Sequence, residues 1–131
     1  MGAERFEAIE SHGLVRLAAA TPEASVADVG ANAAAIRRLA LEAAGKGADI
    51  ILFPELSLSS YAIDDLHLQD ALLDRVEAEI GGLIEASADL PVLLVGAPVR
   101  RAGRLYNVAL VIAGGKLLGV VPKSYLPNYR E

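Results

Sequence analysis

The sequence predicts an α/β fold in which a mixed sheet carries two main helices. Two apolar stripes recur at helical spacing, one over residues 29–43 and the other over residues 72–84. Short apolar runs, typical of strands, lie before, between and after these stripes. Alternating strands and helices favour parallel pairing, whereas glycine-rich turns near the C-terminal end favour an antiparallel section.

The first half of the chain shows the order strand, helix, strand. Leu14 to Ala20 alternates loosely and predicts a strand. Asp28 is a favourable N-cap for the first helix, and Gly45 and Gly47 provide its stop. Asp49 to Phe53 is a short apolar run, as expected of a strand buried on both faces. The short crossover between the two strands predicts that they pair in parallel.

The second half begins with a loop and a second helix and ends in strands. The helix is expected over Leu72 to Ile84, followed by a buried strand over Val92 to Val95. Two further strands, Leu105 to Ile112 and Lys116 to Val121, are separated by a glycine pair that predicts a hairpin. A sheet that stops there leaves apolar surface exposed, so we expect a partner or a longer chain to cover it.

Length and composition limit the possible classes of protein. The 131 residues fit one domain, interpreted as residues 14–131 behind a polar, irregular lead-in at 1–13. A hydrophobic content of 53% excludes disorder, and a net charge of -5 disfavours nucleic acid as a partner. No apolar run is long enough to span a membrane and no signal peptide is evident, so we expect a cytoplasmic protein.

Two charged residues directly follow predicted strands, where open α/β sheets bind their ligands. Glu55 comes after the strand that ends at Phe53, and partial burial there is expected to raise its pKa toward that of a general base. Lys123 follows the last strand, where an ammonium group suits the stabilisation of an oxyanion. The alternative for both residues is an ordinary place on the surface.

Polar residues of the loops and one strand are weaker candidates. Tyr61, Tyr125 and Tyr129 combine an apolar body with a polar tip, which suits either a small polar substrate or a lid over the core. Asn107 interrupts an apolar strand, and we expect it to bond a neighbouring loop in a structural role.

Metal and phosphate motifs receive little support. The pair Asp64 and Asp65 favours a helix start over a cation or phospho-acceptor site. His12 and His67 are isolated and lack zinc-type spacing. The segment 45–47, Gly-Lys-Gly, lacks the other elements of a P-loop.

Two longer strings carry a resemblance to a known family. Residues 47–56 read Gly-Ala-Asp-Ile-Ile-Leu-Phe-Pro-Glu-Leu, and residues 119–131 read Gly-Val-Val-Pro-Lys-Ser-Tyr-Leu-Pro-Asn-Tyr-Arg-Glu. They resemble the glutamate and lysine blocks of the nitrilase superfamily of carbon-nitrogen hydrolases. The long lysine block, together with Phe-Pro-Glu-Leu and Ser-Leu-Ser-Ser-Tyr, is similar to the N-terminal glutaminase domain of the glutamine-dependent NAD synthetases. The resemblance runs from about His12 onward and implies the N-terminal half of an α-β-β-α sandwich.

The resemblance implies a Glu-Lys-Cys triad that hydrolyses the side-chain amide of glutamine through a thioester. Glu55 would be the general base and Lys123 would stabilise the tetrahedral oxyanion. Tyr61 and Tyr129 match positions that line the glutamine pocket, and Glu131 matches an accessory glutamate that positions the triad. The released ammonia would serve a synthetase domain that amidates nicotinic acid adenine dinucleotide to NAD.

The absence of cysteine departs from that pattern. We therefore expect a chain truncated before the catalytic cysteine and inactive as a glutaminase by itself. No cofactor is expected in this chain, because ATP and magnesium would belong to the missing synthetase domain. The parent protein is expected to be a large homo-oligomer with glutamine as its substrate and with neither nucleic acid nor membrane as a partner.

Three alternatives remain at this stage. Another nitrilase-type amidase or carbamoylase shares the glutamate and the lysine, but is expected to lack the Pro-Lys-Ser-Tyr-Leu-Pro-Asn-Tyr string. A catalytically dead nitrilase-like subunit that only binds a partner would also lack the cysteine. A flavodoxin-like receiver module would place paired acids after its first strand, where this chain has Ala19, Ala20 and Thr21.

Overall fold

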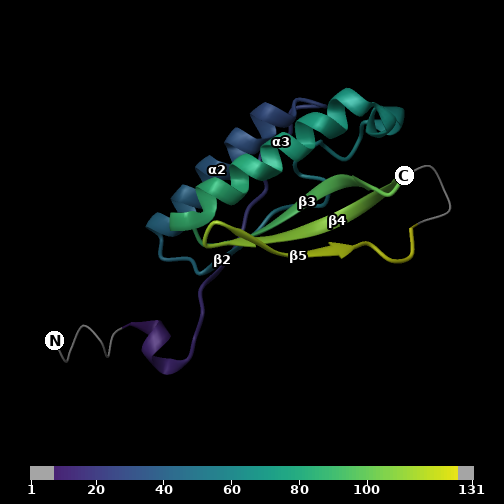
Figure 1. Cartoon of the computed structure of the whole chain (residues 1–131). Coiled ribbons are helices and arrows are strands. Elements are labelled where there is room, and N and C mark those ends of the chain that lie inside the picture. Colours follow the sequence, from purple (N-terminus) through teal and green to yellow (C-terminus); the bar gives the residue numbers. More distant parts are fainter. Residues whose placement is uncertain (1–7, 127–131) are drawn as a thin grey trace.

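The computed structural model describes residues 8–126, in which two long helices cover one face of a mixed sheet (Figure 1). The strands lie side by side in chain order. They are β1 (Leu17–Ala19), β2 (Ile50–Leu52), β3 (Val92–Arg101), β4 (Arg104–Ala113) and β5 (Lys116–Pro122). The long helices are α2 (Val29–Gly45) and α3 (Asp70–Ala86), and the short 3-10 helices are η1 (Ile9–His12), η2 (Asp64–Leu68) and η3 (Ser87–Asp89).

The sheet is parallel in its first part and antiparallel in its second. β1 pairs with β2 and β2 with β3 in parallel, with α2 and α3 in the two crossovers. β3, β4 and β5 follow as two antiparallel hairpins. This confirms the predicted mixed sheet with two main helices. The predicted third strand was too short, because β3 continues to Arg101 and pairs with β4 from Leu93 to Arg101.

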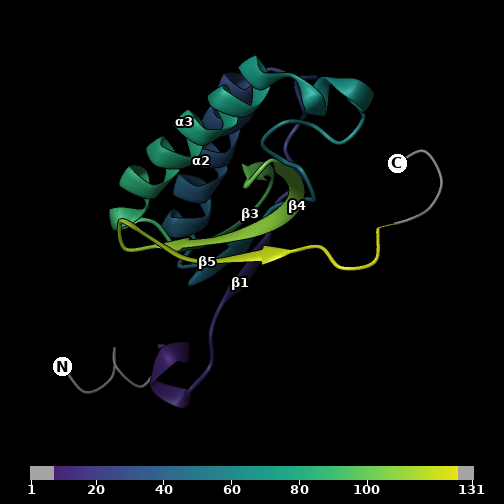
Figure 2. The ribbon, with the colours of Figure 1, turned by 45° about the vertical axis from the view of Figure 1, so that its right-hand side comes forward.

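Local sequence explains where the first helix begins and how it packs. The Asp28 side chain accepts a hydrogen bond from the backbone of Ala31 at 3.0 Å, which confirms the predicted N-cap. The two helices lie side by side on the sheet in both views (Figures 1 and 2). Arg37 of α2 and Glu79 of α3 form an ion pair at 2.5 Å between them.

The core lies between the helices and the sheet, and it draws on both parts of the sheet. Its buried strand residues alternate along their strands, as period-two burial of one face requires. They are Ile51, Leu93, Val95, Ala97, Val108, Leu110 and Ile112, and they pack with Ala33, Ile36, Ala40, Val76 and Leu83 from the helices.

The opposite face of the sheet is not covered by any element of residues 8–126. Ile51 is 1% exposed, but its neighbour Leu52 on the opposite face is 52% exposed. Leu17 and Val121 are also largely exposed. The prediction of a strand buried on both faces is therefore wrong for β2, because both helices lie on one side. The exposed apolar face agrees with the surface that the sequence predicted to need a cover.

Within the described residues, no helix combines the length and the apolar character that crossing a membrane requires. The lead-in contains η1, the purple turn of helix that lies apart from the sheet and from the two long helices (Figures 1 and 2).

Candidate active site

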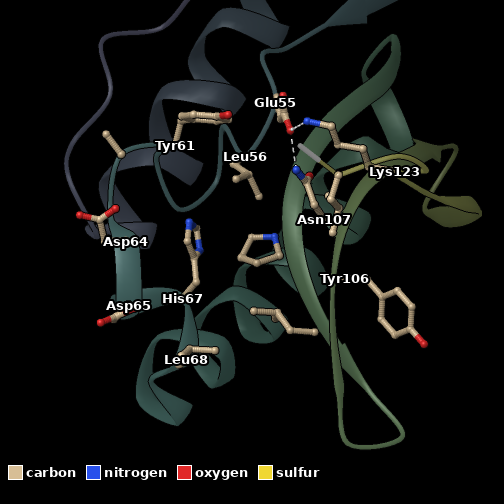
Figure 3. A pocket seen from close by; sticks show the side chains of 14 residues that line it. Glu55, Leu56, Tyr61, Asp64, Asp65, His67, Leu68, Tyr106, Asn107 and Lys123 are labelled. Atoms are coloured by element: carbon tan, nitrogen blue, oxygen red, sulfur yellow. Dashed lines mark hydrogen bonds and ion pairs between the residues drawn. The ribbon is translucent and has the colours of Figure 1, made fainter. Parts of the chain in front are cut away.

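Glu55, Lys123 and Asn107 come together at the end of the sheet that contains the carboxyl end of β2 (Figure 3). The Lys123 Nζ atom lies 2.7 Å from Oε1 of Glu55. The Asn107 Nδ2 atom donates to the same oxygen at 2.5 Å. Two residues that are 68 positions apart in the chain thus form one ion pair, with an amide beside it.

Strand pairing explains why these side chains meet. The Lys123 backbone N–H donates to the Asn107 carbonyl at 2.8 Å, which continues the β4–β5 ladder by one residue beyond the pair of Val108 and Pro122. The Phe53 N–H donates to the Leu94 carbonyl at 2.9 Å and continues the β2–β3 ladder toward Glu55. Ladder bonds therefore set the starting points of both charged segments.

The carboxylate of Glu55 is ionised and held by its partners. The hydrogen bond from Lys123 lowers the pKa of Glu55; burial opposes this change, and the bond from Asn107 reinforces it. The expectation of a raised pKa is wrong, because the Glu55 side chain remains 39% exposed and burial is outweighed by the ammonium group. Within the described residues, both hydrogen bonds that the carboxylate accepts go to Oε1.

Residues 54–60, which we call the Glu55 turn, are held in place by burial and by a hydrogen bond from α2. Residues 56–60 are buried, and Leu58 is fully so. The Asn32 side chain of α2 donates to the Leu58 carbonyl at 3.2 Å. Leu56 and Ser60 adopt φ values of 52° and 78°, a left-handed conformation that costs non-glycine residues free energy and that persists where surrounding structure enforces it. Tyr61 follows directly after this turn.

A cavity of about 790 Å³ opens beside the ion pair. Tyr61 and His67 lie across it from Asn107 (Figure 3). Burial lowers the pKa of His67, against the backbone of Tyr61 and the Asp64 carboxylate, which both favour the charged ring. The cavity is thus lined by an ion pair on one side and by a tyrosine and a largely neutral imidazole on the other.

Other predicted residues lie at the rim or elsewhere. Asp64 and Asp65 begin η2, as predicted, and their carboxylates point away from the cavity in Figure 3. Tyr125 is 98% exposed. Tyr129 and Glu131 lie outside the described residues, so their roles stay predictions.

Asn107 and His67 contribute more than the sequence analysis assigned to them. Asn107 does bond a neighbouring loop, but its partner there is the carboxylate of Glu55. A polar residue inside an apolar strand was the available signal. His67 had no such signal, because a histidine in a loop predicts neither burial nor a neighbour. Within residues 8–126, no group of three or more His, Cys, Asp or Glu residues is placed to hold a metal ion.

The chain is similar to known proteins over most of its length. The model of the carbon-nitrogen hydrolase family matches residues 14–131. The chain belongs to the carbon-nitrogen hydrolase family. It is 52% identical over 127 residues to the N-terminal region of the glutamine-dependent NAD(+) synthetase of Mycobacterium bovis, which covers 96% of this chain and 19% of that protein.

Two solved structures share the fold of this chain. The glutamine-dependent NAD(+) synthetase of Cytophaga hutchinsonii superposes with a TM-score of 0.81 at 25% identity, over 87% of this chain and 20% of that one. An amidase from Nesterenkonia sp. gives 0.73 at 21% identity, over 89% and 45%, and shows the fold alone. The chain thus spans about a fifth of the length of the synthetases it matches.

Proposed function

We propose that this chain forms the first part of the glutamine-hydrolysing domain of a glutamine-dependent NAD synthetase. The ion pair of Glu55 and Lys123 beside an open cavity carries the proposal. Identity of 52% to a protein of that name supports the choice among carbon-nitrogen hydrolases. The chain contains no cysteine, so the nucleophile is proposed to come from a part of the protein outside these 131 residues.

In the proposed mechanism, Glu55 moves protons. Lys123 and Asn107 hold Oε1, which leaves Oε2 to take the proton of the incoming thiol. The sulfur then attacks the amide carbon of glutamine and the carbonyl becomes an oxyanion. As the C–N bond breaks, Glu55 returns the proton to the departing ammonia. Water next attacks the thioester, Glu55 accepts its proton and returns it to the sulfur, and glutamate leaves.

Lys123 is proposed to stabilise two negative charges, first the carboxylate of Glu55 and then the oxyanion. Its ammonium group lowers the pKa of Glu55 and so keeps the carboxylate ionised. The same group lines the cavity, where it can donate to the oxyanion. Proton transfer from a thiol with an ordinary pKa of about 8.5 to such a carboxylate is unfavourable. The nearby positive charge offsets this cost because it also stabilises the thiolate.

The cavity is proposed to bind the side chain of glutamine, with Tyr61 and His67 on the wall opposite Asn107. A neutral imidazole suits an uncharged amide chain better than a charged ring would. ATP-dependent amidation, with its magnesium, is proposed to belong to the remaining part of the protein.

The test uses the full-length protein and the variant Glu55→Gln, assayed for NAD formation with glutamine and then with ammonium chloride. Glutamine-dependent formation should fall by at least about a hundredfold, because removal of a catalytic base typically costs 10²–10⁴ in rate. Ammonium-dependent formation should be unchanged, because added ammonia bypasses the glutaminase step.

A second ion pair of the chain provides the matched control. Glu42 near the end of α2 and Lys46 directly after this helix lie 2.6 Å apart, exposed and away from the cavity, so Glu42→Gln should leave both activities intact. Retention of glutamine-dependent activity by Glu55→Gln would contradict the proposal. It would instead favour the reading in which this part of the protein only binds a partner.

A further inference from the structure

The Glu55 turn lies directly against the backbone of β3 at Gly96. A Cβ atom added at Gly96 would lie 2.4 Å from the backbone nitrogen of Leu56, 2.6 Å from the carbonyl oxygen of Pro54 and 2.9 Å from the carbonyl carbon of Glu55. All three are backbone atoms of the turn, which cannot rotate away as the end of a flexible side chain can. Any side chain at position 96 therefore requires the turn itself to move.

Hydrogen bonds anchor the turn to the same residue. The Leu58 N–H donates to the Gly96 carbonyl at 3.1 Å, and the Ser57 hydroxyl donates to it at 3.3 Å. Gly96 has no left-handed φ, so its conformation does not require glycine. What the fold uses here is the absence of a Cβ, which lets two backbones lie in contact while the carbonyl holds the turn.

We infer that Gly96 is a positioning residue for Glu55: it sets how far the carboxylate stands from Lys123 and Asn107. The bonds to Oε1, at 2.7 and 2.5 Å, leave little room for a shift of the turn. Glu55 is at the centre of the three contacts made by an added Cβ, and Leu56 beside it already has a strained φ. The turn therefore relaxes by moving away from β3, which carries Glu55 with it.

This inference rests on the proposed function, because it concerns the base of the glutaminase step. The first experiment compares Gly96→Ala with Gly119→Ala in the full-length protein. Gly119 is a strand glycine of β5 with no atom within 4 Å of an added Cβ and without a left-handed φ, so it controls for the substitution itself.

Gly96→Ala should lower kcat for glutamine by about ten- to one-hundredfold, because misplacement of a catalytic group by about 1 Å has effects of that order. The KM for glutamine should change less than about threefold, and ammonium-dependent activity should persist. The acidic limb of the pH profile of kcat/KM should move to higher pH, because Glu55 loses the ammonium group that lowers its pKa. A purely structural role would not move this limb.

An unchanged kcat and an unchanged acidic limb in Gly96→Ala would overturn the inference. If Gly96→Ala does not fold, Ser57→Ala tests the same contact by removing one bond to the Gly96 carbonyl without adding an atom. It should lower kcat by about two- to fivefold and shift the limb in the same direction; no change in either would overturn the inference. Failure of the proposed function is distinguishable, since Glu55→Gln would then itself leave glutamine-dependent activity intact.

Discussion

The two segments that carry the charged pair are held in different ways. The Glu55 turn is buried over residues 56–60 and bonded to β3 and to α2. Residues 123–126, which we call the Lys123 segment, are exposed throughout, and the Lys123 N–H donates to the Asn107 carbonyl of β4. The base is therefore held by the burial of its turn, whereas the Lys123 segment is exposed and its ammonium group pairs with Glu55.

This difference teaches where the site tolerates change. A general base must be held within a narrow range of positions, and burial of its turn provides this. A lysine has a long flexible stem and reaches its partner from several backbone positions. Substitutions in the Glu55 turn should therefore affect stability and activity together, whereas substitutions in the Lys123 segment should affect activity alone.

Leu58→Ala should have the largest effect on stability. The Leu58 side chain is fully buried in the core, and truncation of such a leucine costs about 2–5 kcal/mol. The Lys123 segment supplies the control, Leu126→Ala, at a side chain that is 63% exposed and should cost less than about 0.5 kcal/mol. Denaturant unfolding of the full-length protein measures both. Equal shifts of the midpoint would contradict the comparison.

Asn107→Asp should have the next largest effect, on activity. The new carboxylate would lie within bonding distance of Glu55 and repel it, which raises the pKa of Glu55. Glutaminase activity should fall by about tenfold or more near neutral pH, with the acidic limb of its pH profile at higher pH. Asn107→Ala removes the bond without adding charge, so it should shift the limb less. A larger shift in Asn107→Ala than in Asn107→Asp would show that repulsion is not the cause.

Much of the fold could be predicted because its signals are local. Apolar stripes at helical spacing and the Asp28 cap indicate α2 and α3. The glycine pair at 114–115 indicates the last hairpin, which the structure confirms. The exposure of Leu52 could not be predicted from its apolar run, because the sequence of one strand does not show which faces of a sheet receive helices. That depends on both crossovers lying on one side.

The candidate site, like the fold, could be predicted from the sequence only in part. Glu55 and Lys123 could each be singled out because each follows a predicted strand. Their contact could not be predicted, because it depends on strand order and on the register of β4 and β5. The direction of the pKa change of Glu55 could not be found without that contact. Gly96 gave no signal, because a glycine in a strand does not reveal which backbone crosses it. Packing between distant segments carries these features.

The ion pair itself should contribute least to stability, despite its place in the proposed mechanism. Both side chains are about one third exposed or more, and solvent-screened pairs of this kind contribute roughly 0.2–1 kcal/mol. Because the folded pKa of Glu55 is lowered, this contribution is present above the ordinary carboxyl pKa and is lost as pH falls through the folded value.

A double-mutant cycle of Glu55→Gln and Lys123→Met, measured by unfolding at pH 7 and again in acid, should show a small coupling that disappears in acid. Lys46→Met provides the control for loss of an exposed lysine from a similar pair and should leave activity intact. A coupling of several kcal/mol that persists in acid would instead mean that the pair holds the Lys123 segment in place, and the two segments would then be held alike.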